Sequence, residues 1–129
     1  MYVQSDPRST LSADSKPSAA RVHESFFGSQ TALFYETAPQ LKDDNGETWI
    51  SRGQNFVVAY SNGRAGGTFS RTAQPDEYAV IIPDRETRVE ITTADGTAVV
   101  PGYTVAFVPP GDSTIRMLTA GTIVRLFTP

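Results

Sequence analysis

From Thr31 to the end of the chain, short runs rich in Val, Ile, Thr, Phe and Tyr alternate with turns built from Gly, Pro, Asp and Asn. β-branched and aromatic residues favour strands, whereas Gly, Pro, Asp and Asn favour turns. Residues 94–97, Ala-Asp-Gly-Thr, predict a hairpin with a two-residue Asp-Gly loop. Because no run has a helical period, we predict an all-β fold, a sandwich or a barrel. The predicted strands are residues 31–36, 48–52, 55–61, 68–71, 77–83, 87–92, 97–100, 103–108, 113–118 and 122–128.

Several of these runs are apolar on both faces. Residues 56–59, 79–82 and 104–108 do not alternate between apolar and polar side chains, as a strand with one face in water should. One face of such a strand can line a barrel, and the other needs a second sheet, the N-terminal arm or another subunit as cover. We therefore expect a homodimer, in which the first part of one chain covers the outer sheet face of its partner.

The composition narrows the classes of function. A length of 129 residues suits one domain with its own core. The net charge is −3 and no basic cluster is present, so neither nucleic acid nor an anionic membrane is an expected partner. The chain has no Cys, which excludes disulfides and fits a reducing compartment. No apolar run reaches the roughly 20 residues of a membrane span, and we expect a cytoplasmic protein.

The first 20 residues differ from the rest of the chain. They are rich in Ser, Asp and Pro and hold few large apolar side chains, so they bury too little surface to offset the entropy of ordering. We predict a flexible N-terminal arm over residues 1–20 and one β-barrel domain over residues 21–129. The sequence leaves open whether this barrel is a whole protein or one half of a two-barrel protein.

Two segments carry a recognisable pattern. Residues 67–78 read GTFSRTAQPDEY, and residues 102–114 read GYTVAFVPPGDST. They resemble the two signature motifs of the cupin family, although the stretch from Gly102 to Pro109 is one residue longer than the usual spacing. The resemblance covers roughly residues 53–127, and it implies a double-stranded β-helix, the jelly-roll barrel of the cupins.

In cupins, the first motif supplies two histidines and a glutamate to a metal, and the second motif supplies a further histidine. An alignment without gaps matches these positions to Arg71, Ala73, Glu77 and Thr114. Only the glutamate agrees, and the fixed positive charge of Arg71 repels a cation. The single histidine, His23, lies outside both motifs. The resemblance therefore implies a cupin-like barrel with no metal and no cofactor.

Two readings of Arg71 and Glu77 remain open. They can form an internal ion pair, because neither charge is stable when buried alone. Alternatively, Arg71 holds the anionic group of a ligand while Glu77 acts as an acid or base. In this second reading the hydroxyls of Thr114, Tyr60 and Tyr78 complete the ligand site.

Three functions follow from these readings. The first is a metal-free, cupin-like domain that binds a small organic ligand, expected to be an anion, in its barrel. The second is a metal-independent isomerase, epimerase, cyclase or lyase that uses Glu77 as acid or base and Arg71 as an anion clamp. The third is a structural or oligomerisation barrel without catalysis.

Overall fold

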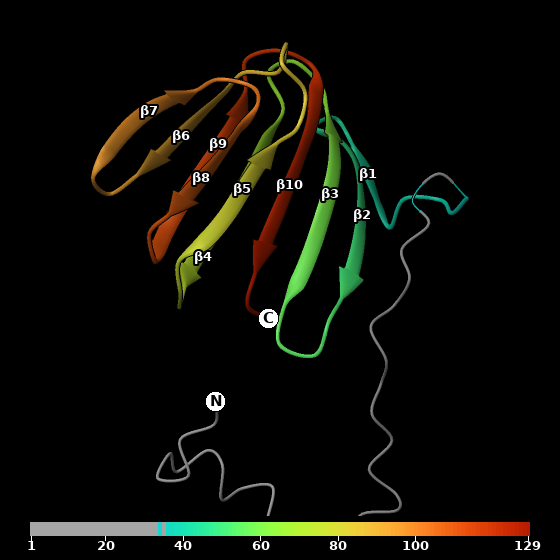
Figure 1. Cartoon of the computed structure of the whole chain (residues 1–129), viewed down its shortest axis with the longest axis horizontal. Helices are drawn as coiled ribbons and strands as arrows, with labels where there is room; N and C mark the ends of the chain where they lie inside the picture. The colour runs from blue at the N-terminus through green and yellow to red at the C-terminus, as the bar shows by residue number, and fades with distance from the viewer. Residues whose placement is uncertain (1–33, 35) are drawn as a thin grey trace, which may run out of the picture.

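A computed structural model describes residues 34 and 36–129 of the chain. Two antiparallel β-sheets face each other in it as a jelly roll (Figure 1). The strands are β1 (Leu41–Asp43), β2 (Gly46–Arg52), β3 (Val57–Gly63), β4 (Thr68–Gln74), β5 (Tyr78–Ile82), β6 (Val89–Thr93), β7 (Gly96–Val100), β8 (Thr104–Val108), β9 (Gly111–Met117) and β10 (Gly121–Phe127). The six-stranded sheet has the order β1-β2-β3-β10-β5-β8, and the four-stranded sheet has the order β4-β9-β6-β7.

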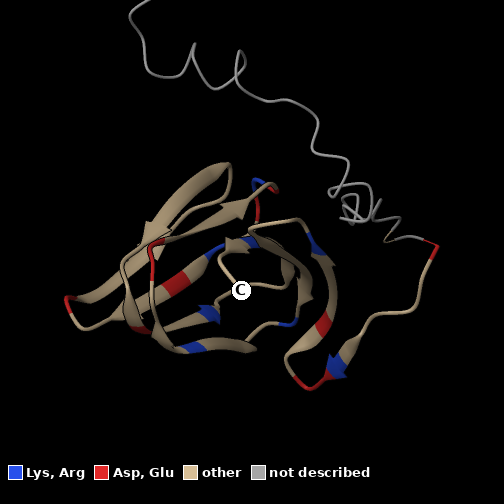
Figure 2. Ribbon diagram, turned by 90° about the horizontal axis from the view of Figure 1, so that it is seen from below, with Lys and Arg blue, Asp and Glu red and all other residues tan. Residues whose placement is uncertain are grey.

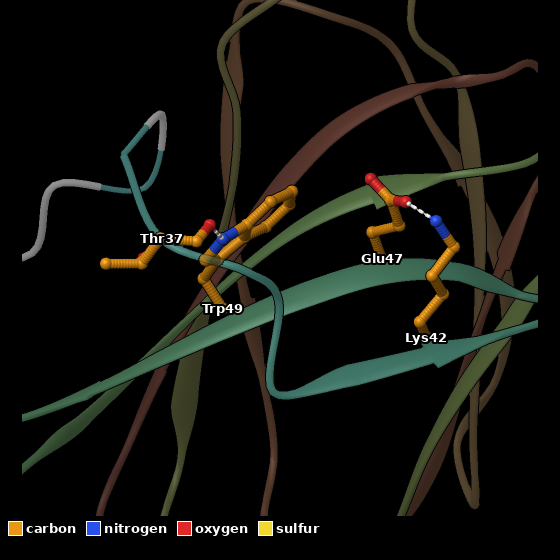
Figure 3. A network of polar contacts seen from close by, with 4 residues as sticks. All are labelled: Thr37, Lys42, Glu47 and Trp49. Atoms are coloured by element: carbon orange, nitrogen blue, oxygen red, sulfur yellow. Dashed lines mark hydrogen bonds and ion pairs between the residues drawn. The ribbon is translucent and has the colours of Figure 1, made fainter.

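The all-β prediction is confirmed, and every strand predicted from residue 48 onward is present with small differences at its ends. Strand β1 was not predicted, because it is short, exposed and polar. It forms by pairing with β2, where Lys42 lies opposite Glu47. The Lys42 Nζ and a Glu47 carboxylate oxygen are 2.7 Å apart (Figure 3). Of the predicted strand 31–36, the two described residues, Phe34 and Glu36, lie in turns.

The predicted hairpin at residues 94–97 joins β6 to β7, but its loop is shifted by one residue. Thr93 pairs with Gly96, so the two loop residues are Ala94 and Asp95 and the glycine opens the next strand. Gly96 has a φ of 132°, a conformation that residues with a Cβ atom rarely adopt. The glycine is therefore needed where the backbone re-enters the sheet.

The space between the two sheets is filled mainly by apolar side chains. They occupy alternate positions of their strands, because the pleat points every second side chain inward. Strands of both sheets contribute, so the same cluster holds the sheets together. Its buried members are Phe69, Tyr78, Val80, Ile82, Val89, Ile91, Val108, Ile115, Met117 and Ile123.

Residues before β1 cover part of the outer face of the six-stranded sheet. The ring of Phe34 stacks on Tyr60 with 4.7 Å between centroids, and the Trp49 indole N–H donates a 2.8 Å hydrogen bond to the carbonyl oxygen of Thr37 (Figure 3). The side-chain amide of Gln40 bonds the backbone of Ile50. Part of the outer face of this sheet, over β2 and β3, is thus covered by the same chain.

Some sequence-based predictions lie outside the described residues. They concern the arm over residues 1–20 and His23. The homodimer also stays a prediction at this point. Within the part of the chain that the structure describes, no helix is long and apolar enough to cross a membrane.

We predict that Ile115→Ala lowers the free energy of unfolding by roughly 2–5 kcal/mol, because Ile115 is fully buried between the sheets and truncation leaves a cavity. The matched control is Leu118→Ala one residue beyond the same strand, where the side chain is exposed and the expected change is at most about 1 kcal/mol. Urea unfolding followed by the fluorescence of the single tryptophan, Trp49, measures both. Equal changes in the two variants would contradict this description of the core.

Candidate functional site

Strand β4 brings two polar side chains to the inner face of the barrel. Its alternation is interrupted by a β-bulge between Arg71 and Gln74. At the bulge Ala73 has a φ of 50°, and its N–H donates a 2.7 Å hydrogen bond to an Asp112 carboxylate oxygen. Beyond the bulge Gln74 is buried. Its side-chain oxygen accepts a 2.7 Å hydrogen bond from Arg71 Nε.

Arg71 also lies over the ring of Phe127, with its guanidinium carbon 4.0 Å from the ring centroid. Phe127 in turn contacts Tyr78 edge-on, at 6.5 Å between centroids. A guanidinium stacked on an aromatic ring is partly desolvated yet keeps donors free for a partner. Arg71 is half-buried, so its charge can be reached from solvent.

The most unusual residue of the interior is Arg125 on β10. Its side chain is only 8% exposed, and its guanidinium carbon lies 4.7 Å from the centroid of Phe69. Among residues 34 and 36–129 the only ion pair is the one between Lys42 and Glu47, so no described carboxylate neutralises Arg125. Its Nε is buried and has no hydrogen-bond partner. A buried charge normally has an opposite charge beside it.

Within the described residues, the only hydrogen bond of this charge is to a neutral hydroxyl. Arg125 donates a long hydrogen bond of 3.4 Å to the Ser61 hydroxyl, which also bonds Thr48 at 2.8 Å. On the other sheet, the Ser113 hydroxyl lies 2.8 Å from that of Tyr78. Each of these hydroxyls can donate or accept, so the set can adapt to a polar molecule.

The environment disfavours the charged form of Arg125. Burial lowers the pKa of its guanidinium to about 10, because the barrel solvates the charge less well than water does. The nearby Tyr78 opposes this shift, and the positive charge of Arg71 adds to it. A shift of this size corresponds to on the order of 3 kcal/mol against the charged form at neutral pH.

The structure brings two of the predicted site residues together and leaves three apart. Arg71 and Tyr78 lie in the interior, next to Arg125 and Phe127. Glu77 is exposed in the segment before β5, and the described residues show no ion pair between it and Arg71. The internal ion pair considered above is therefore not formed.

Thr114 and Tyr60 lie on outer faces. Thr114 bonds Ser70 at 3.1 Å at an exposed position, whereas its neighbour Ser113 points inward. Tyr60 stacks on Phe34. Both outcomes follow from the pleat, because a shift of one residue moves a side chain to the other face of a sheet.

Sequence reasoning missed Arg125, Ser61, Thr48 and Ser113. One signal was available for Arg125, which interrupts an otherwise apolar strand pattern, Ile-Val-Arg-Leu-Phe over residues 123–127. A charge at an inward position of such a strand is costly unless it has a partner. The hydroxyl residues gave no comparable signal, because Ser and Thr are common on exposed strand faces.

Comparison with solved structures identifies the architecture. The chain matches an RmlC-like cupin from Shewanella frigidimarina with a TM-score of 0.64 at 13% identity, over 78% of this chain and 93% of that chain. The fold is a cupin fold. KdgF from a Halomonas species matches this cupin fold with a TM-score of 0.61 at 10% identity, over 78% of this chain and 93% of that one.

A cupin superfamily protein from Desulfitobacterium hafniense matches with a TM-score of 0.58 at 10% identity, over 69% of this chain and 82% of that chain. No family model matches the sequence, and no curated protein matches it. At these identities the likeness establishes the cupin fold alone.

The residues at the positions matched to cupin metal ligands do not fit a metal. Ala73 sits in the bulge, Glu77 is exposed and Thr114 lies on an outer face. Two arginines occupy the interior instead, and their charge repels a cation. Throughout residues 34 and 36–129, no group of three or more His, Cys, Asp or Glu side chains is placed to hold a metal ion.

We predict that Arg125→Met stabilises the protein without ligand by roughly 1–4 kcal/mol, because an apolar side chain of similar length removes an unpaired buried charge. The pKa of Arg125 is lowered in the folded state to about 10. The free-energy cost of its buried charge is therefore fully present below that pH and declines as the pH rises above it. The stability difference between variant and wild type should therefore be constant from roughly pH 5 to 9.

Thermal and urea unfolding at several pH values measure this difference. The control is Arg116→Met, at an exposed position on β9. A lower stability of Arg125→Met than of Arg116→Met would contradict the description of Arg125 as an uncompensated charge.

Proposed function

We propose that this protein binds a small organic anion inside its cupin barrel, without a metal. The observation that carries the proposal is Arg125, a buried guanidinium with no described counter-charge and an unsatisfied Nε. A folded protein that keeps such a charge gains from it only when an anion is present. The chain has no Cys, which fits a reducing compartment, and the proposal includes a cytoplasmic location.

A carboxylate is the anionic group that fits Arg125 best. The planar guanidinium offers parallel N–H donors that match two carboxylate oxygens, and the free Nε supplies one of these donors. The rings of Phe69 and Phe127 flank the two arginines and form apolar walls. The hydroxyls of Ser61 and Ser113 complete a set suited to a short carboxylic acid with further polar groups.

Arg71 has a second role in this proposal. It is half-buried and held in place by Gln74 and Phe127. A positive charge that solvent can reach raises the local concentration of anions and speeds their capture. Seen along the strands, the two sheets surround the C-terminus as a ring, and both basic and acidic segments lie on the strands that border it (Figure 2).

The alternative functions receive less support. The isomerase or lyase needs Glu77 within reach of the bound anion, but Glu77 is exposed and directly precedes the inward-facing Tyr78. The inert structural barrel gives no reason for a destabilising arginine in the interior. Binding without catalysis is therefore the function that we propose.

We predict that small mono- and dicarboxylates raise the melting temperature of the wild-type protein and that Arg125→Met abolishes this response. Loss of the buried charge should weaken binding by roughly 2–5 kcal/mol. Calorimetric titration with the carboxylates that give the largest thermal shift measures the affinity. Arg125→Lys keeps the charge but loses the planar fork, and should bind with intermediate affinity.

Arg116→Met is the control here as well, and it should bind like the wild type. If Arg125→Met still responds to the carboxylates as the wild type does, Arg125 is not the anion-binding group. If no carboxylate stabilises the wild type, and native mass spectrometry finds no co-purified acid, the proposed function is incorrect.

We also predict that the protein purified under mild conditions contains no stoichiometric transition metal, because sites of this kind need several imidazole or carboxylate ligands. Elemental analysis by mass spectrometry tests this directly. A content of about one Fe, Mn, Ni or Zn per chain would contradict the metal-free proposal, since that stoichiometry requires a specific site.

A further inference from the structure

Each of the two sheets ends in two edge strands. In the six-stranded sheet these are β1 and β8, and in the four-stranded sheet they are β4 and β7. An edge strand has backbone N–H and C=O groups on one side without a partner strand, so it can pair with another chain. Proteins commonly prevent such pairing with short edge strands, charged side chains or bulges. The presence or absence of these features shows where a further strand can be added.

Two of the four edges carry this protection. Strand β1 has only 3 residues, and two of them, Lys42 and Asp43, are charged. Strand β4 contains the charged Arg71 and the bulge that follows it. Both edges therefore disfavour the addition of another strand.

The edges of β7 and β8 carry no such protection. Their sequences, Gly-Thr-Ala-Val-Val and Thr-Val-Ala-Phe-Val, contain neither a charge nor a proline, and β8 pairs with β5 in an unbroken register. Val99 on β7 is 57% exposed, and Val105 and Phe107 on β8 are 52% and 68% exposed. Although β7 and β8 follow each other in the chain, they do not pair with each other. Two unprotected apolar edges thus border one gap.

A hollow of about 370 Å³ lies between these two strands. Ala98 on β7 lies opposite the buried Ile91, and Ala106 on β8 lies opposite the buried Val80. Cross-strand neighbours share a face of the sheet, so both alanines point between the sheets, where their small side chains leave space. No side chain of the proposed anion site lines this hollow, which makes it a separate feature of the molecule.

We propose that the gap between β7 and β8 binds an extended segment of another protein, which adds a strand to the edge of β8. The backbone of the segment pairs with the free N–H and C=O groups of β8, and its inward side chains enter the hollow. A small apolar molecule would fill the hollow but leave both edges without hydrogen-bond partners. An occupant between two edges uses both of its own edges, whereas an edge strand of a second copy has only one free. An unpaired extended segment meets both conditions.

The lining of the gap indicates which segment fits. Strand β8 has 5 residues, so a segment of about six residues in extended conformation covers it. The only charged residue that lines the hollow is Asp95, and within the described part of the chain it forms no ion pair. Asp95 and Pro109 line the same end of the hollow, where β8 has just ended. An antiparallel segment brings its N-terminal end to this place, so a basic residue there complements the carboxylate.

A labelled peptide, Arg-Val-Thr-Val-Thr-Val with blocked ends, serves as the probe for the full chain. Fluorescence anisotropy measures its Kd, and we expect saturable binding. A control peptide has proline in place of the first threonine. Its Kd should be at least about tenfold higher, because proline removes an N–H donor and disrupts the extended pairing.

Two matched alanine variants test the hollow. Ala98→Leu adds a larger side chain at an inward position that is nevertheless exposed, and it should raise the Kd of the probe at least about tenfold by filling the space that the probe needs. Ala120→Leu makes the same change in the exposed turn between β9 and β10 and should bind like the wild type. Circular dichroism and the melting temperature show whether both variants are folded.

The predicted charge contact has its own pair of variants. Asp95→Asn keeps a residue suited to the turn and should raise the Kd of the probe by about two- to fivefold, as expected for an exposed ion pair. The Kd of a probe with glutamine in place of arginine should not change. Asp44→Asn, in the turn between β1 and β2, is the control and should leave both values unchanged.

Hydrogen exchange tests whether the probe adds a strand. At saturation it should slow the exchange of the backbone amides of Thr104–Val108 and leave those of Leu41–Asp43 on the protected edge unchanged. Unchanged exchange in β8 would contradict strand addition, and equal binding by Ala98→Leu and the wild type would remove the hollow from the site. No saturable binding up to about 1 mM would overturn the proposal. A Kd that rises with protein concentration would also overturn it, because a second copy would then compete for the edge.

Discussion

The two-residue period of the strand pleat decides what this barrel contains. On β10 it sends Ile123, Arg125 and Phe127 inward together, so one positive charge enters an apolar row. On β4 the bulge breaks the period after Arg71 and brings Gln74 to the interior in place of Ala73. The polar side chains inside the barrel therefore come from β10, which keeps the two-residue period, and from β4, in which the bulge breaks it.

That lining has a net positive charge and no described carboxylate. Packing between the sheets must exceed the unfavourable free energy of holding Arg125 in the barrel, and the core cluster supplies this stability. A protein that retains an unfavourable charge in its interior commonly does so for binding, and stability is then lower than the fold allows. In the function that we propose, the charge that lowers the stability of the barrel also supplies its affinity for an anion.

Much of the fold was predictable from the sequence, because strands and turns depend on local residue types. The interior location of Arg71 and Tyr78 was also predicted. Thr114 was assigned to the site through an ungapped motif, although the motif is one residue longer than usual, and the structure places Ser113 inward instead. Arg125 is distant in sequence from both motifs, and its isolation depends on neighbours from other strands that no local pattern reveals.

The bulge on β4 has a consequence for any attempt to engineer this barrel. Returning histidines to the positions that the motif alignment suggests would place one of them at residue 73, on an exposed kink with a φ of 50°. The inward neighbours are residues 71 and 74, and residue 113 pairs with residue 71 on the adjacent strand β9. To build a metal site in this scaffold, ligands should be placed at these three positions. The backbone geometry, and not the spacing of the motif in the sequence, decides which side chains point inward.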